Sequence, residues 1–472
     1  METMQKDNKI TIGGLFSKLS IDFFYGGLYP AIMAIFTVFC FIFKLQLGGV
    51  LVFVVLACFL LIKIDDLTPI IPLLLDFIFL FNDLDVMSNP LFYVMVAPVL
   101  VFYVLHVIKF PIKVFNFGQL FLPLCLVTIA LLLCGILSPY SDEYVKGLLY
   151  TIPLGPVLLI VYLIFANGIK YPRGFDIRKW ILYCILLVGF ICLMQFWALY
   201  IKGKLIDGKE NFKVGEVGWG NVNTIATMLM IAIPCASYMV VKTKYFVQGI
   251  LAVLLLYFTI YMTKSDGCLG ISLAFLPFLA FFVFKHLYKL PKKIFGWFVY
   301  SVILAVVLAL VIISAMGKFD KIIDFILDSI KGESGRTKLY TDALRVFERY
   351  PVFGVGFGYY NDYAYTAPGG ELRLFNFHST FFHVLASSGL VGLVAYAFYF
   401  YARFKILTKY NTPFNLFAFI CFAMFTCYGM IDCVEFSTIP CMLLINSLLL
   451  CCEFANRKGP DLKNLPLQLY GL

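Results

Sequence analysis

Two of the chain's four histidines lie in one short stretch, FNFHSTFFHVLASSGLVG, at residues 375–392. A histidine side chain titrates near neutral pH, so at a boundary between water and lipid it can act as a general base. We therefore take His378 as a candidate catalytic base, although an interface histidine without chemistry fits the same position. His383 follows about one helical turn later and is assigned to packing.

Three basic residues are candidates for binding an anion. Arg336 opens a predicted helix, where the helix macrodipole favours anions over cations, and this conflict points to a ligand role. A phosphate there can use both the helix-terminal N–H groups and the guanidinium. Lys264, in TKSDG, and Lys213, in the segment 202–220, lie on the face where basic residues are disfavoured. Lys264 also fits a lysine that extends to the membrane boundary beside Asp266.

Two further features have a plainer interpretation. Asp76 lies near the middle of a predicted span, and an intramembrane carboxylate is a functional candidate. An ion-coupled transporter usually needs several such groups, and Gln195 and Asn446 do not supply them. The GVGFG sequence at residues 354–358 has no preceding strand, so we interpret it as a tight turn after a helix rather than a nucleotide-binding loop.

The composition indicates which class of protein carries these groups. Of the 472 residues, 62% are hydrophobic and 14% are charged, which is far more apolar than a soluble domain. We predict an all-α, polytopic transmembrane helical bundle of about 12 to 14 spans with one long helical extracytoplasmic loop. The predicted spans lie at about 24–43, 48–64, 67–81, 91–108, 120–137, 148–166, 180–201, 221–241, 246–262, 268–285, 296–316, 388–404, 414–431 and 436–452.

The charges of the loops predict an orientation. With both termini in the cytoplasm, the basic segments face the cytoplasm and loops such as NDLDVMSN, SPYSDEY and DCVEFST face outward. The first residues lack an apolar core followed by a cleavage site, so we expect no removable signal peptide. The net charge of +10 is then loop charge, and no nucleic-acid partner is expected. The basic segments are 109–113, 170–179, 285–293, 403–409 and 457–463.

The long polar segment divides the chain. Within it, DKIIDFILDSI and RTKLYTDALRVFERY repeat apolar residues at helical spacing, and Pro351 ends the second of these helices. We expect transmembrane helices with short loops at 1–316 and an extracytoplasmic loop domain at 317–387. Transmembrane helices and a short cytoplasmic tail follow at 388–472. The outer face would also carry the segment 202–220 and TKSDG.

Three segments together resemble a known family. GNVNTIATMLMIAIP resembles an Asn-x-Asn stretch that enters a span and ends in proline. GRTKLYTDALRVFERYPVFGVGFGYY is similar to a pattern of Gly-Arg, amphipathic helix, Pro and Gly-x-Gly turn. FNFHSTFFHVLASSGLVG resembles a His-Asn or His-Ser segment followed by Gly-Leu-x-Gly. Over roughly residues 180–405, the chain resembles the O-antigen ligase and O-antigen polymerase superfamily of polytopic membrane glycosyltransferases.

The resemblance implies a site and a reaction. Family members hold a glycan carried on a polyprenyl diphosphate in a cavity at the outer face and work without a metal or cofactor. By position, Arg336 matches the arginine that holds the diphosphate, and His378 matches the essential histidine. Where the family commonly has Ser-Arg-Gly, this chain has Asp266 as the middle residue, and we expect Lys264 or Lys213 to supply the missing charge.

Two more residues complete the predicted site: Arg373 and Asn223 are candidates for substrate binding. The fourteen cysteines lie mostly inside spans and predict neither a disulfide framework nor a zinc site.

The resulting hypothesis is an inverting, metal-independent glycosyltransferase of the bacterial cytoplasmic membrane. It would move a polyprenyl-diphosphate-linked oligosaccharide onto a glycan or lipid-linked acceptor at the outer face, for a surface polysaccharide such as lipopolysaccharide or capsule. We favour a polymerase over a ligase, because TKSDG departs from the ligase pattern. The alternatives are a transporter or flippase for a polar or lipid-linked solute, which predicts intramembrane charges along a path, and a structural scaffold.

Overall fold

The fold is taken from a computed structural model. It describes residues 22–80, 90–112, 114–139, 151–170, 175–201, 222–242, 245–289, 296–297, 301, 335–356, 377–437 and 439–457. Across these residues the chain is helical and contains no strand. The predicted all-α class is therefore confirmed for the part of the chain that the structure describes.

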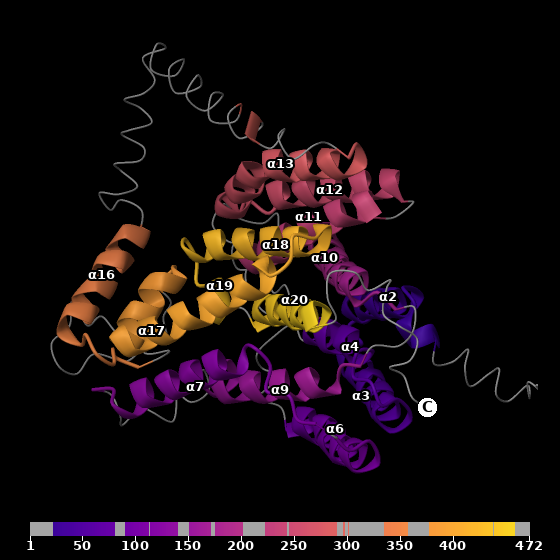
Figure 1. Cartoon of the computed structure of the whole chain (residues 1–472), viewed down its shortest axis with the longest axis horizontal. Coiled ribbons are helices and arrows are strands. Elements are labelled where there is room, and N and C mark those ends of the chain that lie inside the picture. The colour runs from indigo at the N-terminus through magenta and orange to yellow at the C-terminus, as the bar shows by residue number, and fades with distance from the viewer. Residues whose placement is uncertain are drawn as a thin grey trace, which may run out of the picture.

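The helices pack as a bundle (Figure 1). Their bounds are α2 (Leu28–Ile42), α3 (Gln46–Lys63), α4 (Ile70–Phe77), η1 (Ile78–Leu80), α6 (Pro90–Lys109), α7 (Phe121–Ile136), η3 (Pro153–Val157), α9 (Leu158–Gly168), α10 (Ile177–Ile201), α11 (Val222–Lys242), α12 (Phe246–Met262), α13 (Asp266–Leu287), α16 (Gly335–Arg349), α17 (Thr380–Thr408), α18 (Pro413–Gly429), α19 (Val434–Ser437) and α20 (Ile439–Arg457).

Many of these helices suit a membrane. Five of them, α3, α10, α11, α13 and α17, are long and apolar enough to cross one, and several shorter helices are also apolar. The short third predicted span corresponds to α4 and η1. The predicted span at 296–316 falls almost wholly outside the described residues. The protein is thus a multi-pass membrane protein by the length and composition of its helices.

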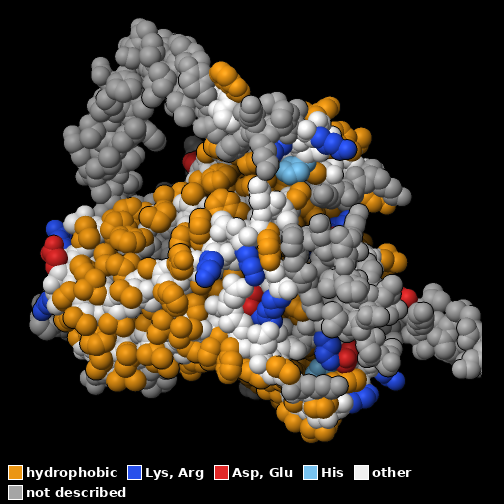
Figure 2. Space-filling model, viewed as in Figure 1, with side chains coloured by type: hydrophobic (Ala, Val, Ile, Leu, Met, Phe, Trp, Pro, Cys, Tyr) orange, Lys and Arg blue, Asp and Glu red, His pale blue; other side chains and the backbone are white. Residues whose placement is uncertain are grey.

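Helix α11 forms the centre of the bundle. It packs against α10, α12, α13 and α18, and 94% of its most apolar 18-residue stretch is buried. Close packing depends on small residues, as is common between helices in lipid. A Cβ atom on Gly189 of α10 would lie 2.5 Å from the Cβ of Ala232 in α11. The outward side of neighbouring helices is apolar, and hydrophobic side chains cover much of the face seen in Figure 2.

Helix α17 is broken at Gly389, where φ is 57°. The break leaves backbone groups without helical partners, and the turn after α16 pairs with them. Gly356 donates its N–H to the Ser387 carbonyl at 2.9 Å, and Leu390 donates to the Pro351 carbonyl at 2.9 Å. Irregular backbone inside a membrane bundle is tolerated when protein satisfies it in this way.

Both glycines of this junction are required by geometry. Gly354 has φ 66°, and an added Cβ would meet the Ser387 carbonyl carbon at 2.4 Å. A Cβ on Gly389 would meet Val352 backbone atoms at 2.6 Å. The glycine-rich turn predicted after the second loop helix is therefore present, and its role is to fix α16 against α17. Helix α17 accordingly begins at Thr380, earlier than the predicted span start at 388, because its first part precedes the break.

The structure changes the interpretation of one basic residue. The predicted span 388–404 ends just after Arg403; we expected the basic segment 403–409 to face the cytoplasm and Glu435 to lie in an outer loop. Arg403 lies inside α17, is 2% exposed, and forms an ion pair with Glu435 of α19. The guanidinium also lies 3.8 Å from the centre of the Tyr399 ring. Lys405 and Lys409 of the same segment are exposed.

Candidate active site

His378 sits in a strained backbone position just before α17. Its φ is 48°, in the left-handed region that residues other than glycine rarely adopt. The next residue, Ser379, is extended and forms the N-cap of α17. The Tyr340 hydroxyl of α16 donates a hydrogen bond of 3.0 Å to the His378 carbonyl. Such strain persists only where the surroundings hold it, and it concentrates at functional sites.

The imidazole of His378 faces a carboxylate. Its Nδ1 lies 3.2 Å from Oδ1 of Asp432. The His378 side chain is 38% exposed, whereas that of Asp432 is 10% exposed. We infer from this contact that Nδ1 carries the proton, because a carboxylate accepts and does not donate. Nε2 is then the basic nitrogen of a histidine that water or a substrate can reach.

Asp432 is itself held from several sides. Its Oδ1 also accepts the Cys433 backbone N–H at 2.8 Å, and its Oδ2 accepts the Tyr428 hydroxyl at 3.3 Å. The Asp432 backbone N–H donates to the Tyr428 carbonyl at 2.9 Å. Thr380, at the start of α17, donates to the Asp432 carbonyl at 3.5 Å. These contacts fix the carboxylate beside the imidazole.

Sequence reasoning did not find Asp432. We used its segment, DCVEFST, only as evidence for an outer loop. The available signal was a carboxylate in the short connection between the last two predicted spans, on the same face as His378. A lone acidic residue in an outer loop is common, so only the three-dimensional contact singles it out.

Tyr428 connects this pair to the TKSDG segment. A Cβ on Gly267 would lie 3.0 Å from the Tyr428 ring, so the start of α13 packs directly on α18. The side chains of Ser265 and Cys268 are hydrogen-bond partners of Tyr428. Ser265 is buried and occupies the N-cap position of α13. The TKSDG segment therefore lies next to the residues that hold His378.

Cys268 extends the same contacts to α11. Its Sγ lies 3.7 Å from Oγ1 of Thr227, which donates to the Asn223 carbonyl at 2.8 Å. Asn223 is the second residue of α11 and is half-buried. The structure thus brings the Asn-x-Asn stretch, TKSDG and the His378 segment to one end of the bundle. We call the set from Asn223 through Thr227, Ser265, Cys268, Tyr428 and Asp432 to His378 the site network.

Lys264 lies at the edge of the site network. It is exposed, and its φ of 57° places it in a second left-handed position. Its Nζ is 5.1 Å from the centre of the Tyr261 ring, a cation–π contact. Asp266 is in the first turn of α13, where the macrodipole favours a carboxylate. This gives a structural reason for an acidic residue where the resembled family has arginine.

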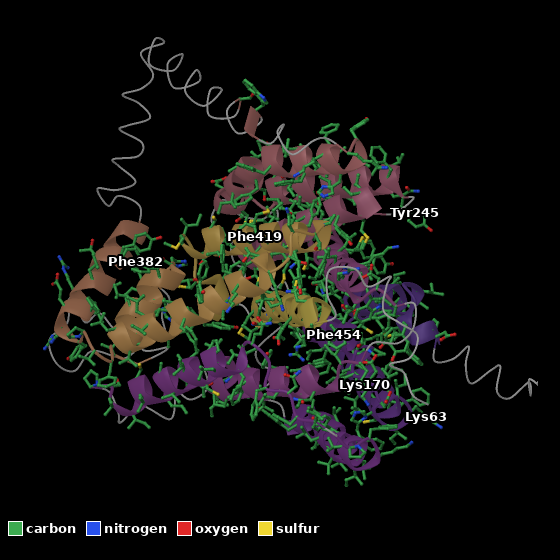
Figure 3. The ribbon with its side chains drawn as sticks, in the orientation of Figure 1. Lys63, Lys170, Tyr245, Phe382, Phe419 and Phe454 are labelled. Atoms are coloured by element: carbon green, nitrogen blue, oxygen red, sulfur yellow. The ribbon has the colours of Figure 1, made fainter. Side chains whose placement is uncertain are left out.

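Helix α16 brings the Gly-Arg segment toward the same place. Its backbone includes Arg336 as the second residue, while the side chain of Arg336 lies outside the described part of the structure. Tyr340, about one turn later, stacks on Phe382 of α17 with ring centres 4.6 Å apart. Figure 3 shows Phe382 between these two helices. The other predicted basic residues, Lys213 and Arg373, lie outside the described residues.

The remaining candidates occupy different surroundings. His383 is 2% exposed, and its ring packs against Phe377 and Phe436, as expected for a packing residue. Asp76 is 3% exposed, and its Oδ2 has no hydrogen-bond partner among the described residues. The structure does not bring Asp76 to the site network. Among the described residues, no group of three or more His, Cys, Asp or Glu side chains is placed to hold a metal ion.

The fold and the site together define a polytopic membrane protein in which a histidine contacts a carboxylate at one end of the helical bundle. Residues 251–397 match the model of the family described as O-antigen ligase. The matched segment contains TKSDG, α16, the glycine-rich turn and His378. The match confirms the resemblance over these residues. No similar sequence is found among curated proteins.

Proposed function

We propose that the protein is a membrane glycosyltransferase of the O-antigen ligase and polymerase type. It transfers a glycan from a polyprenyl-diphosphate donor to an acceptor hydroxyl at the outer face of the bacterial cytoplasmic membrane. The observation that carries this proposal is the contact between His378 and Asp432, made at the point where the segments of the resemblance meet. The family match over residues 251–397 supports the same class of reaction.

The proposed reaction is a single displacement. The acceptor hydroxyl oxygen attacks the anomeric carbon of the donor glycan, and the bond from that carbon to the diphosphate oxygen breaks. Nε2 of His378 takes the hydroxyl proton, and Asp432 stabilises the imidazolium that forms. The electron pair of the broken bond leaves with the lipid diphosphate. One displacement inverts the configuration at the anomeric carbon.

The leaving diphosphate needs positive charge close to the site network. Arg336 is proposed to bind it, since α16 is anchored to His378 through Tyr340. Lys264 is exposed beside the buried Ser265 and is the described candidate for the second positive charge. Lys213 and Arg373 are the other basic candidates, and Asn223 is proposed to contact the glycan. No metal or cofactor is part of this mechanism.

The number of spans, the orientation in the membrane and the identity of the acceptor are part of the same proposal. About 12 to 14 spans with both termini in the cytoplasm would place the site network outside. We favour a polymerase or capsule-type role, in which the acceptor is another lipid-linked repeat. The alternative is a ligase whose acceptor is a terminal glycan or lipid of the envelope. In both cases the substrates are carried by the membrane.

The test is complementation of a deletion strain with wild type, His378→Ala or Arg336→Ala at matched protein levels. Polymer length and linked glycan are read on a gel, and lipid-linked repeats are assayed on each side of the membrane. His286→Ala and Arg349→Ala are matched controls: Nδ1 of His286 lies 2.7 Å from the Phe282 carbonyl of α13, and Arg349 is the last residue of α16.

We expect both site variants to lose transferred glycan while lipid-linked repeats accumulate outside, and the controls to stay active. Normal product in His378→Ala and Arg336→Ala would contradict the proposed site. Accumulation of lipid-linked repeats on the inner side would instead identify a flippase.

A further inference from the structure

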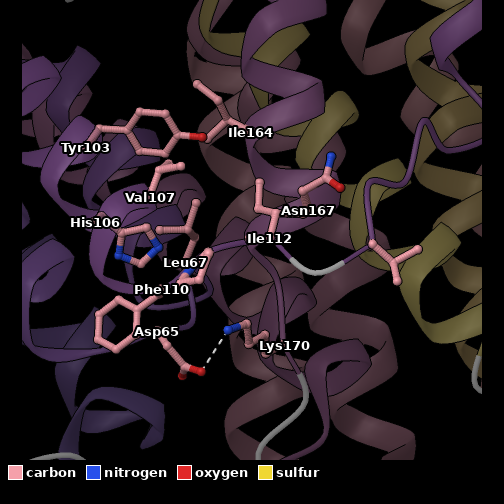
Figure 4. A pocket seen from close by; sticks show the side chains of 13 residues that line it. Asp65, Leu67, Tyr103, His106, Val107, Phe110, Ile112, Ile164, Asn167 and Lys170 are labelled. Atoms are coloured by element: carbon pink, nitrogen blue, oxygen red, sulfur yellow. Dashed lines mark hydrogen bonds and ion pairs between the residues drawn. The ribbon is translucent and has the colours of Figure 1, made fainter.

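A cavity of about 400 Å³ opens at the end of the bundle opposite to His378. Its walls come from the last turns of α6 and α9 and from the segments that follow α3 and α6. Figure 4 shows Tyr103, His106 and Phe110 along one side and Ile164 and Asn167 along the other. The site network has no residue in this cavity.

The two sites are separated by the length of the bundle. Helix α10 begins a few residues after Lys170 and has 25 residues, so it spans about 37 Å. Its far end leads toward α11, where Asn223 joins the site network. Figure 3 shows Lys170 and Lys63 at one end of the molecule and Phe382, next to the His378 segment, at the other.

Two of the described residues that line the cavity, Lys170 and Asp65, carry opposite charges at its mouth. Nζ of Lys170 lies 2.7 Å from Oδ2 of Asp65, and the two side chains are 47% and 51% exposed. Such a half-exposed ion pair contributes little to stability, so both groups remain able to engage a ligand. The Lys109 ammonium adds positive charge nearby, where it donates to the Ile62 carbonyl and lies 5.1 Å from the Phe110 ring centre.

The inner wall of the cavity combines aromatic and apolar side chains. Leu67, Val107 and Ile164 line it together with Tyr103 and Phe110. Aromatic faces attract ammonium groups, and the apolar residues suit the glycerol and first methylenes of a lipid. His106 directs Nδ1 at the Leu61 carbonyl, 2.8 Å away, which fixes the ring orientation.

The surroundings of the cavity are open to lipid. Helix α6 packs mainly against α3, and it lies at the edge of the bundle in Figure 1. Val104 and Ile108 on α6 are 57% and 71% exposed. On the neighbouring segment, Val114 and Phe115 are exposed as well. Acyl chains therefore have an apolar surface beside the charged mouth.

We propose that this cavity binds the headgroup of a phospholipid that carries both a phosphate and a primary ammonium group. The phosphate contacts the ammonium groups of Lys170 and Lys109, and the lipid ammonium contacts Asp65 and the aromatic wall. The two opposite charges at the mouth match a zwitterionic headgroup better than a purely anionic one, because Asp65 repels a second negative charge. This inference does not depend on the proposed transferase activity.

The test uses the full-length protein purified in a mild detergent. Retention of added lipid is measured by native mass spectrometry with dioleoyl phosphatidylethanolamine, dioleoyl phosphatidylglycerol and dioleoylglycerol. The variants are Lys170→Gln and Asp65→Asn, both of which leave the Lys170 backbone N–H bonded to Asp66. Ile112→Trp fills the cavity from a residue that is 39% exposed, so the fold tolerates the larger side chain. Lys405→Gln is the matched control, an exposed lysine of α17 outside the cavity.

We expect phosphatidylethanolamine to be retained better than the other two lipids. Each of the three cavity variants should weaken its retention about tenfold, since a charge-assisted contact or the cavity space is lost, while Lys405→Gln should have no effect. Equal retention of dioleoylglycerol, or cavity variants that behave as wild type, would overturn the proposal. Equally tight binding of soluble phosphoethanolamine in place of the lipid would overturn its lipid part.

Discussion

The two ends of the bundle use buried carboxylates in different ways. At the end opposite to His378, Glu453 is fully buried and accepts the Tyr162 hydroxyl at 2.7 Å, the Gln119 backbone N–H at 2.9 Å and the guanidinium of Arg457. At the His378 end, Asp432 holds an imidazole that is 38% exposed.

The difference lies in what the carboxylate leaves accessible. The hydrogen bonds of Glu453 connect α20 to α9 and to the start of α7. They therefore hold together helices that are distant in the sequence. The main partner of Asp432 is a histidine in a strained, left-handed position at the surface. We conclude that Glu453 stabilises the bundle, whereas Asp432 orients the partly exposed imidazole of His378. The predictions below separate stability from transfer on this basis.

The largest effect on folding is expected from Glu453→Ala. The change leaves a hydroxyl, a backbone N–H and a guanidinium without their acceptor in a buried place, which should cost about 3–5 kcal/mol. Thermal unfolding in detergent and the yield of folded protein measure the loss. The control is Glu348→Ala, at an exposed position of α16. Transfer per folded molecule should be unchanged, and a stable but inactive Glu453→Ala protein would contradict the comparison.

The next largest effect is expected from Gly389→Ala, which affects both properties. Alanine at φ 57° costs about 1–3 kcal/mol, and its Cβ would meet the Val352 backbone at 2.6 Å. We expect a lower melting temperature and reduced transfer, because α16 loses its fixed position. The control is Gly270→Ala on α13, where an added Cβ meets nothing within 4 Å. Equal stability of the two variants would contradict the proposed junction.

A smaller, pH-dependent effect is expected from Asp66, which lies between α3 and α4. Burial raises its pKa from 3.8 to about 6, and this outweighs the hydrogen bonds it accepts from Thr68 and Lys170. The folded state therefore binds a proton more tightly than the unfolded state, so this contribution to stability is present below about pH 4 and is lost as pH rises through about 6.

Melting temperatures in detergent from about pH 3.5 to 7.5 measure this effect, because that range spans both pKa values of Asp66. Wild type should lose more stability than Asp66→Asn as the pH rises. Parallel curves for the two proteins would show that Asp66 does not titrate in this range.

The smallest effect is expected from Tyr340→Phe. The variant loses the hydrogen bond to the His378 carbonyl but keeps the ring stacked on Phe382. We expect a loss of about 1 kcal/mol and a few-fold slower transfer, because the left-handed backbone of His378 is held less firmly. Initial rates in membranes measure it, with Tyr350→Phe as the control. Identical rates would remove Tyr340 from the positioning of His378.

Much of the fold was predictable because lipid imposes a strong pattern on sequence. Apolar length predicted the all-α class, and the helical spacing after Arg336 predicted α16 with its glycine-rich turn. The break at Gly389 was not predicted, because the hydropathy of α17 is continuous across it and only tertiary hydrogen bonds reveal it.

The candidate site was likewise predictable from the sequence only in part. Residue type and membrane side singled out His378, and the resemblance added its expected role. Asp432 could not be found from sequence, because its importance comes from a contact with a residue 54 positions away. The burial of Arg403 was not predicted for a similar reason, since it depends on the ion pair with Glu435 of α19.

The most direct test of the central claim is the pH dependence of transfer by Asp432→Asn. Initial rates and the KM for the native lipid-linked donor are measured in membranes for wild type, Asp432→Asn and the exposed control Glu348→Gln. We predict that Asp432→Asn lowers kcat about ten- to hundredfold with little change in KM, and shifts the pH profile, because an amide neither fixes the tautomer of His378 nor stabilises its imidazolium. If Asp432→Asn keeps the wild-type rate and pH profile, His378 does not act through Asp432 and the central claim is wrong.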